Sequence, residues 1–220
     1  MKSVVLLSGG LDSCVMAAMA KEEGEVIALS FDYQQRHRHE LDAATLIAHH
    51  LNIQHQIVPL LIPSSSALTD KSQTIVKNRL PEEMVGIPST YVPARNTLFL
   101  SYAVSFAESL GASQIMMGAN LHDRACYPDC SPAFFTAFNA LLQVALKDTS
   151  INVKTPLIHL TKKEIILEGL RLQAPISLSF SCYDPHNNES CGRCDACVLR
   201  AQGFEEAYRS LRSGSEKPNS

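Results

Sequence analysis

The 220-residue sequence lacks three features that would place it in common classes of protein. It has no run of about 18 apolar residues, so we expect no membrane-spanning helix. Asp and Glu (22) outnumber Lys and Arg (19), so the net charge is −3 and there is no general positive field to attract nucleic acid. The short apolar run after Met1 leads into Gly9-Gly10 instead of a signal-peptide cleavage site. We therefore expect a cytoplasmic protein that binds neither membranes nor nucleic acid.

The composition suits a globular domain of moderate size with a small appendage. Hydrophobic residues make up 45% of the chain and charged residues 19%, as in ordinary globular proteins. The seven cysteines are an odd number, and three of them lie within residues 191–197. In a reducing compartment, such a cluster favours a metal site over a disulfide framework.

Short apolar runs alternate with helical patterns through most of the chain. The runs are brief, rich in branched residues and bounded by Gly, Ser or Asp, as in the buried strands that we expect at residues 4–7, 26–31, 56–60 and 115–117. Apolar residues recur at helical spacing in the segments between them, which are residues 13–23, 40–51 and 96–110. This alternation requires parallel strands with right-handed crossovers. The sequence therefore predicts an α/β fold with a Rossmann-like, doubly wound parallel sheet.

The connection formed by residues 61–94 breaks this rhythm. It is much longer than the usual ~4–6 residues and is rich in proline, which is typical of a lid or a binding loop. An insertion without function is the alternative. Beyond it, Ser131-Pro132 and the capping box of Thr161 and Glu164 each predict the start of a helix.

The pattern changes after Pro175, where the cysteines begin. We therefore divide the chain into a main domain of residues 1–175, a metal-binding segment of residues 176–212 and a polar tail of residues 213–220. The segment contains a short amphipathic helix from about residue 195. The tail is expected to be disordered.

Residues 8–13, Ser-Gly-Gly-Leu-Asp-Ser, follow the first strand directly and open the first helix. Free backbone amides and the positive end of the helix meet there, which makes an anion site. Gly9 and Gly10 let the main chain approach the anion closely, and the two serines add hydroxyl donors. The motif has no lysine, unlike the Walker loop, and its glycines are adjacent, unlike those of the dinucleotide fingerprint. A plain strand-to-helix turn capped by Asp12 is the structural alternative.

This motif resembles the PP-loop of the ATP pyrophosphatases, the adenine nucleotide alpha hydrolase-like enzymes that cleave ATP between its α- and β-phosphates. The resemblance implies that AMP is transferred to a substrate while the loop holds pyrophosphate. Asp12 would then help to hold Mg²⁺ against the phosphates. The residues assigned to ATP are Leu7, Ser8, Gly9, Gly10, Leu11, Asp12 and Ser13.

Four cysteines follow the pattern C-x8-C-x2-C-x2-C; they are Cys182, Cys191, Cys194 and Cys197. Four thiolates at ~2.3 Å from one Zn²⁺ form a closed tetrahedral site without a position for water. The pattern therefore predicts one structural zinc ion per chain. An iron–sulfur cluster and a redox pair are the alternatives.

Several polar residues lie at the expected carboxyl ends of the strands, where open parallel sheets bind ligands. Arg36 and His37 belong to a run of cations after the second strand, for which a solvated helix start is the alternative. Residues 91–96, Tyr-Val-Pro-Ala-Arg-Asn, combine an aromatic ring, a fixed turn and a bidentate donor. Further along the chain, an aspartate could accept from the amidine-like edge of a purine analogue and a tyrosine could stack on its face; the candidates are Asp123, Tyr127 and Asp129.

Taken in order, these motifs resemble the 7-cyano-7-deazaguanine synthase (QueC) family over about residues 3–207. The matching segments are SGGLDS, SFDYQQRHRHE, STYVPARN, YPDC, KTPLIHLTKKEI and SCY…CGRCDACVLRAQGFEEA. The resemblance implies a C–N ligase of queuosine biosynthesis that converts 7-carboxy-7-deazaguanine and ammonia to the nitrile. It would adenylate first the carboxylate and then the amide, releasing AMP and diphosphate, with ATP, Mg²⁺ and one structural Zn²⁺.

The resemblance also implies a homodimer and a set of site residues. The catalytic assignments are Asp12, Ser13, Arg36, His37 and Arg95. The 7-deazapurine would be bound by Tyr33, Tyr91, Arg95, Asn96, Asp123, Tyr127 and Asp129.

The chain departs from the family pattern at two places. Relatives typically have a glycine where this chain has Gln34, and a small Ser-Gly pair where it has Ala125-Cys126. Both changes fall near the expected pocket and bear on the acceptor. The alternatives are therefore a related protein acting on a different acceptor, a tRNA-thiolating PP-loop enzyme, and a zinc-organised binding module without catalysis.

Overall fold

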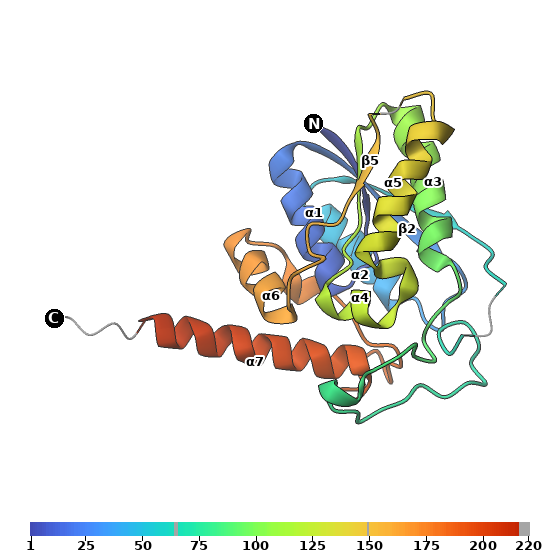
Figure 1. Cartoon of the computed structure of the whole chain (residues 1–220). Coiled ribbons are helices and arrows are strands. Elements are labelled where there is room, and N and C mark those ends of the chain that lie inside the picture. The colour runs from blue at the N-terminus through green and yellow to red at the C-terminus, as the bar shows by residue number, and fades with distance from the viewer. Residues whose placement is uncertain (64–65, 149, 216–220) are drawn as a thin grey trace.

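The computed structural model describes residues 1–63, 66–148 and 150–215 and contains one parallel sheet with helices on both faces (Figure 1). Its strands lie in the order β3-β2-β1-β4-β5. They are β1 (Lys2–Leu6), β2 (Glu25–Asp32), β3 (Gln54–Pro59), β4 (Gln114–Met116) and β5 (Asn152–Lys154). The doubly wound α/β fold predicted from the sequence is confirmed.

The strand order places a topological switch point beside β1. The chain winds outward through β2 and β3, then returns to pair β4 with the other edge of β1, so that Val4 lies between Ile27 and Ile115. Because the crossovers leave β1 in opposite directions, a crevice opens at the carboxyl ends of β1 and β4. The loop at residues 8–13 stands at this crevice.

Alternate residues of the central strands feed two separate apolar layers. Val4 and Phe31 pack with α3 (Arg95–Leu110) and α5 (Pro132–Ala145) on one face. Val5 and Ala28 pack with α1 (Leu11–Glu23), α2 (His39–His50) and α6 (Lys162–Arg171) on the other. Since both faces are covered, the strands read as continuous apolar runs, which is why the sequence revealed them.

Two short elements were not predicted. β5 has three residues, two of them polar, and pairs only with β4. The six-residue helix α4 (Leu121–Cys126) begins at Asn120, whose side chain accepts from the backbone amides of His122 and Asp123. Neither segment has an apolar period long enough to be recognised in the sequence.

The helix α7 (Asp195–Ser215) forms the C-terminal end of the described chain and projects away from the sheet in Figure 1. It packs closely against α6, because a Cβ on Gly203 would lie 2.6 Å from the Cβ of Lys162. The helix continues three residues past the predicted boundary at Arg212, so residues 213–215 are helical and not part of a tail. The rest of the predicted tail, residues 216–220, lies outside the described residues. Every helix in the described chain is too short or too polar to cross a lipid bilayer.

The long connection after β3 contains little regular structure apart from η1 (Pro81–Glu83) but is fastened to the C-terminal segment. Lys77 Nζ lies 2.6 Å from Asp184 Oδ2, and the backbone amide of Asn78 donates to the carbonyl of Arg193 at 2.8 Å. Arg79 pairs with Asp195 at the start of α7. The connection is therefore a fixed cover over one end of the sheet.

Candidate active site

A cavity lies at the carboxyl ends of β1 and β4 and gathers most of the residues selected from the sequence. Those that line it are Ser8, Gly10, Leu11, Asp12, Ser13, Tyr33, Arg36, His37, Tyr91, Arg95, Asn96, Asp123, Tyr127 and Asp129. Leu7 and Gly9 do not line it. The long connection contributes to its wall through Arg79, Met84, Gly86, Pro88 and residues 90–92, so this connection belongs to the site.

The loop at residues 8–13 joins β1 to α1, as predicted. Gly10 is the N-cap of α1 and Asp12 lies in the first turn, so Asp12 does not cap the helix. Ser8 and Ser13 hold the loop through their hydroxyls, 3.0 Å apart, and Ser13 also donates to the carbonyl of Gly10 at 3.0 Å. Residues 10–13, at the start of α1, line the cavity, and the backbone amides of Gly10 and Leu11 donate to the hydroxyls of Ser8 and Ser181, both at 3.3 Å.

Leu7 and Gly9 shape this loop from beneath. The amide of Leu7 donates to the carbonyl of Leu29 at 2.8 Å, which continues the sheet into the loop. Gly9 has a φ of +90°, and a Cβ at this position would lie only 1.9 Å from the carbonyl oxygen of Glu40. Only glycine fits between the loop and the first turn of α2.

Asp12 connects this loop to two other segments. Its Oδ2 accepts from Lys162 Nζ at 2.5 Å and from Asn120 Nδ2 at 3.1 Å. Its Oδ1 is buried and has no hydrogen-bond partner among the described residues. A buried carboxylate oxygen without a donor is costly unless a ligand binds it.

A second carboxylate, that of Asp123, lies close to Asp12. Burial raises the pKa of Asp123 to about 6, Lys162 opposes this shift, and the charge of Asp12 adds to it. Two carboxylates that disfavour each other's charge, one with an unpaired oxygen, fit a hard divalent cation with oxygen ligands. The donor set therefore fits Mg²⁺.

Lys162 and Arg200 are basic residues of the cavity that sequence reasoning did not select. Arg200 of α7 donates to the hydroxyls of Ser179 (2.8 Å) and Ser181 (3.4 Å), and Ser181 in turn accepts from the amide of Leu11 at 3.3 Å. Both cations lie far from residues 8–13 in the sequence. Lys162 belongs to the quoted segment KTPLIHLTKKEI, which was the only signal for it.

An aromatic wall faces the phosphate loop. Arg95 is positioned by Tyr33, since its Nη1 donates to the Tyr33 hydroxyl at 3.4 Å and its guanidinium lies over the Tyr33 ring. The hydroxyl of Tyr127 shares a hydrogen bond with Thr90 at 3.1 Å, and its ring lies 6.4 Å from that of Tyr91. Planar groups beside an arginine suit an aromatic acid.

Asn96 and Asp129 bind each other. The backbone amide of Asn96 donates to Asp129 Oδ2 at 3.1 Å, and the side-chain Nδ2 of Asn96 donates to the backbone carbonyl of Asp129 at 3.2 Å. Both side chains are buried. These bonds anchor the start of α3, so much of the hydrogen-bonding capacity of the two residues is used within the protein.

Arg36 is similarly committed. Its Nη1 donates to the carbonyls of Ala67 (3.1 Å) and Gln73 (3.0 Å), and its Nε lies 3.4 Å from Asp184 Oδ1. The guanidinium thus ties the long connection to the C-terminal segment at the edge of the cavity. Burial lowers the pKa of the neighbouring His37, and a backbone contact with Cys182 opposes this shift.

The two departures from the family pattern both have a structural counterpart. Gln34 has a φ of +62°, which is the left-handed conformation that favours glycine. Cys126 is buried in the cavity wall, where its thiol donates to the carbonyl of Met84 at 3.3 Å.

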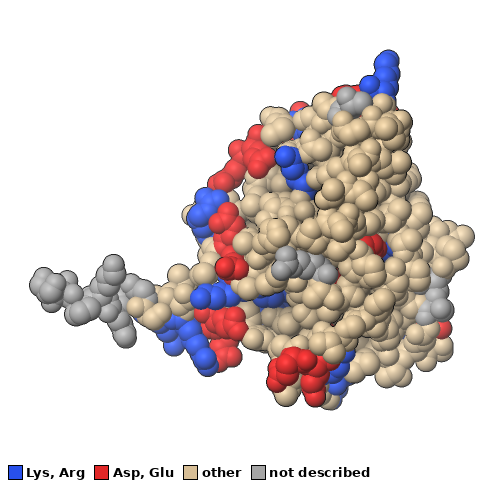
Figure 2. All heavy atoms as spheres, in the orientation of Figure 1, with Lys and Arg blue, Asp and Glu red and all other residues tan. Residues whose placement is uncertain are grey.

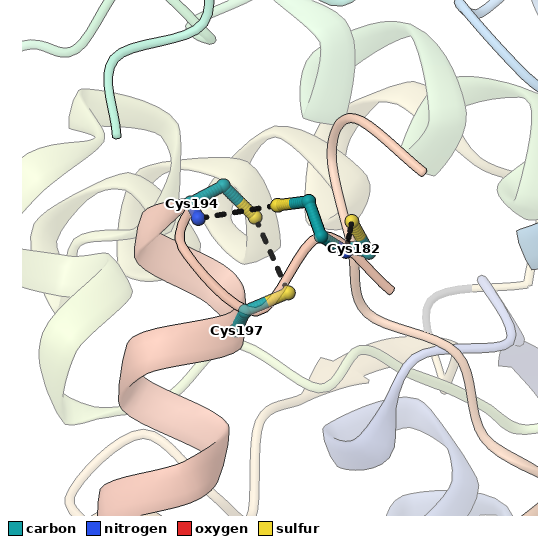
Figure 3. Close-up of side chains that lie close together, drawn as sticks. Cys182, Cys194 and Cys197 are labelled. Atoms are coloured by element: carbon teal, nitrogen blue, oxygen red, sulfur yellow. Dashed lines mark hydrogen bonds between the residues drawn. The ribbon is translucent and has the colours of Figure 1, made fainter. Parts of the chain in front are cut away.

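The four cysteines of the C-terminal segment meet at one point. The sulfurs of Cys182, Cys191, Cys194 and Cys197 all lie within 4.8 Å of one another. Figure 3 shows Cys194 just before α7 and Cys197 in the first turn of α7, facing Cys182 on an irregular segment, and the sulfurs of Cys194 and Cys197 are 3.5 Å apart. The predicted metal-binding cluster is thus assembled by the fold.

Backbone amides support these sulfurs. The amides of Cys191 and Asp184 donate to the sulfur of Cys182 at 3.2 and 3.4 Å, and the amide of Cys194 donates to that of Cys191 at 3.3 Å. Such donors stabilise metal-bound thiolates. Four sulfurs this close fit a single tetrahedral ion, whereas a four-iron cluster holds each thiolate on a separate iron and spaces them farther apart.

The chain was compared with protein families and with curated proteins. The family model described as "Queuosine biosynthesis protein QueC" matches residues 2–208. A 7-cyano-7-deazaguanine synthase of Leptospira interrogans serogroup Icterohaemorrhagiae serovar Lai is 49% identical over 212 residues, covering 93% of this chain and 87% of the relative. The enzyme of the same name from Desulfatibacillum aliphaticivorans is 48% identical, covering 94% and 93%.

Among solved structures, the U34-tRNA thiolase NcsA from Methanococcus maripaludis, with its [4Fe-4S] cluster, is similar to this chain. The TM-score is 0.51, the identity is 15%, and the match covers 99% of this chain and 74% of the thiolase. At this identity the similarity concerns the fold alone.

Proposed function

This chain belongs to the QueC family of queuosine biosynthesis proteins, and we propose from this membership and from its site that it makes 7-cyano-7-deazaguanine. It is an enzyme of the ATP-dependent, C–N bond-forming kind. The acid substrate is 7-carboxy-7-deazaguanine and the nitrogen donor is ammonia. One observation carries the proposal: the loop at residues 8–13, Lys162 and the Asp12 oxygen that has no partner among the described residues lie in one cavity with an aromatic, arginine-bearing wall.

The chemistry requires activation of the acid twice. A carboxylate oxygen is a poor leaving group, but transfer of AMP to the carboxylate turns it into one that ammonia can displace to give the amide. Conversion of the amide to the nitrile removes the second oxygen, for which a second adenylation is the simplest route. Each round releases AMP and diphosphate.

Two walls of the cavity would bind the two substrates, one the phosphates of ATP and the other the deazapurine acid. The amides of residues 8–13 and the cations Lys162 and Arg200 would hold the phosphates and stabilise the charge that develops at phosphorus. Mg²⁺, held by Asp12 with Asp123 nearby, would supply further neutralisation of that charge. Tyr33 and Arg95 would hold the deazapurine acid in line with the α-phosphate.

We assign the four-cysteine cluster to one structural Zn²⁺. A closed set of four thiolates leaves no position for water, and the cluster supports the cover and α7, so we assign it no step in the reaction. The division into a catalytic domain of residues 1–175 and a metal-binding segment of residues 176–212 is part of this proposal, as are a homodimer and a cytoplasmic location.

No observation favours an enzyme that acts on tRNA. Such an enzyme needs a basic face. On the face drawn in Figure 2, lysines and arginines alternate with acidic side chains, and most of the surface carries neither.

The test is incubation of the purified protein with ATP, Mg²⁺, ammonium and 7-carboxy-7-deazaguanine, followed by mass spectrometry. We expect the nitrile, with the amide as its precursor, and AMP in place of ADP. Formation of ADP, or consumption of ATP that does not depend on the acid, would contradict the proposal. Size-exclusion chromatography with light scattering tests the homodimer.

A further inference from the structure

Glu40 lines the cavity, although the sequence motifs did not single it out. It stands in the first turn of α2, and its carbonyl oxygen is the atom against which Gly9 packs. The same cavity is lined by Tyr33, Arg95 and the loop at residues 8–13. The fold therefore brings Glu40 next to the loop that we assign to the phosphates.

Glu40 differs from the other carboxylates that line the cavity in having no protein partner. Asp12 is held by Lys162, Asp123 by Asn120, Asp129 by Asn96 and Asp195 by Arg79. Within residues 1–63, 66–148 and 150–215, no hydrogen bond or ion pair engages the carboxylate of Glu40. Glu40 is half-buried, so its carboxylate is open to a hydrogen-bond donor supplied by a ligand or by water.

The environment of Glu40 also favours proton exchange near neutral pH. Burial raises the pKa of its carboxyl to about 7, Arg95 of α3 opposes the shift, and Cys194 of the C-terminal segment adds to it. The hydroxyls of Tyr33 and Tyr183 complete the titratable groups that face it. A base is most effective when its pKa lies near the working pH.

The reaction needs such a group. Ammonia, like the lysine amine, is almost fully protonated at neutral pH, and the ammonium ion has no free electron pair with which to attack a carbonyl. The ammonium cation also needs a negatively charged partner in the cavity. The phosphate-binding wall is positively charged and does not provide one.

We propose that Glu40 binds ammonium and acts as the general base that converts it to ammonia; this inference rests on the proposed function. The carboxylate takes one proton from ammonium, and the freed nitrogen lone pair attacks the carbonyl carbon of the acyl adenylate. As the C–N bond forms, the C–O bond to AMP breaks and AMP leaves with the electron pair. The nitrogen loses a second proton to water, and Glu40 releases the first, so each amide formed yields two protons.

The test compares Glu40→Gln with Asp42→Asn, a matched change on the exposed side of the same helix. Adenylation is measured without ammonium, as acid-dependent exchange of labelled pyrophosphate into ATP. Amide formation is measured with ammonium from pH 6 to 9. Hydroxylamine, an amine that is already neutral at pH 7, serves as the bypass nucleophile.

For Glu40→Gln we expect normal pyrophosphate exchange but a kcat for amide formation lowered by about 10²–10³-fold with ammonium. Wild-type activity should fall as the pH drops below about 7, because the base becomes protonated, and this step should be missing in the variant. Hydroxylamine should restore most of the lost rate. Glu40→Asp should keep the pH step at a reduced rate.

Two results would overturn the inference. If exchange falls as much as amide formation, Glu40 holds the acid or the phosphate loop instead of ammonium. If the pH profile and the ammonium-dependent kcat of Glu40→Gln match those of the wild type, the carboxylate is not the base. A wild-type protein that forms neither the adenylate nor the amide would instead contradict the proposed function.

Discussion

Asp12 joins three parts of the chain that are far apart in sequence. The phosphate loop supplies the carboxylate, the segment after β4 supplies Asn120, and α6 supplies Lys162. One carboxylate oxygen is used in these bonds and the other is left buried without a donor. The residue therefore combines a structural bond with an open coordination position, which suits a metal-bound nucleotide.

We expect Asp12→Asn to lower AMP formation by about 10²-fold or more, because the amide cannot replace a charged ligand beside the phosphates. The fold and the metal content should remain, since the amide has the same shape. The measurement is acid-dependent AMP release with a circular dichroism check. The control is Glu22→Gln, which removes a charge from an exposed ion pair of the same helix; unchanged AMP release in Asp12→Asn would remove the residue from the site.

Gly9 lets the loop at residues 8–13 pack directly against α2, because it has no side chain. A methyl group here meets the main chain of α2, and backbone cannot move aside as a flexible side chain does. The same contact positions Glu40 beside the loop.

Gly9→Ala should lower the free energy of unfolding by more than about 3 kcal/mol and abolish ATP binding. Gly111→Ala is the matched control, because Gly111 also has a left-handed φ of +65° but has open space around it. Gly111→Ala should lower the free energy of unfolding by only about 1 kcal/mol, because alanine is less stable than glycine in the left-handed conformation. Denaturant titration and nucleotide binding measure both variants, and equal losses would show that the steric contact with Glu40 is unimportant.

At the scale of elements, the cover formed by residues 66–94 is held by charge. Lys77 pairs with Asp184, two residues after Cys182, and Arg79 pairs with Asp195, the residue after Cys194. Ile75 packs among the cysteine side chains. Ion pairs and side-chain packing therefore connect the cover, the metal-binding segment and the cavity wall to one another.

Asp195→Asn should loosen this unit without unfolding the sheet. A half-broken, largely buried ion pair costs on the order of 1–3 kcal/mol, so we expect faster hydrogen exchange around residues 77–84. The KM for the acid should rise, since Met84, Pro88 and residues 90–92 of the cover line the cavity. Glu205→Gln, which breaks an exposed ion pair of the same helix, is the control; equal exchange in the two variants would argue against a fastened cover.

At the scale of the whole molecule, the cysteine cluster joins the end of the chain to its beginning. Phe180 donates its amide to the carbonyl of Gly9 at 2.9 Å, two residues before Cys182. Ser181 and Arg200 continue this junction. Loss of the metal should therefore affect both stability and nucleotide binding.

Cys194→Ser should give protein with less than one metal ion per chain. A loss on the order of 3 kcal/mol would lower Tm by about 6–12 °C for a chain of this size. The control is Cys14→Ser, because Cys14 is fully buried in α1 and is not part of the cysteine cluster. This variant should keep its full metal content. Metal analysis and thermal unfolding decide the matter, and stoichiometric metal with an unchanged Tm in Cys194→Ser would refute the ligand assignment.

The sequence by itself determined the doubly wound sheet, the glycine-containing loop between β1 and α1, and the cysteine cluster. Each depends on local order: apolar runs of strand length, glycines at a strand-to-helix junction, and cysteines spaced for one turn. The family resemblance extended this to the substrate and is confirmed by the match over residues 2–208.

Only the tertiary structure decided which charged side chains meet at the site. Lys162, Arg200 and Glu40 look like ordinary surface charges in the sequence, because α6, α7 and α2 reach the crevice only through the crossovers and the metal segment. Conversely, Arg36 and Asn96 were selected as site residues, and their side chains prove to be largely engaged in internal bonds. Local sequence records the period and spacing of residues, whereas the partner of a buried charge is set by contacts between segments far apart in the chain.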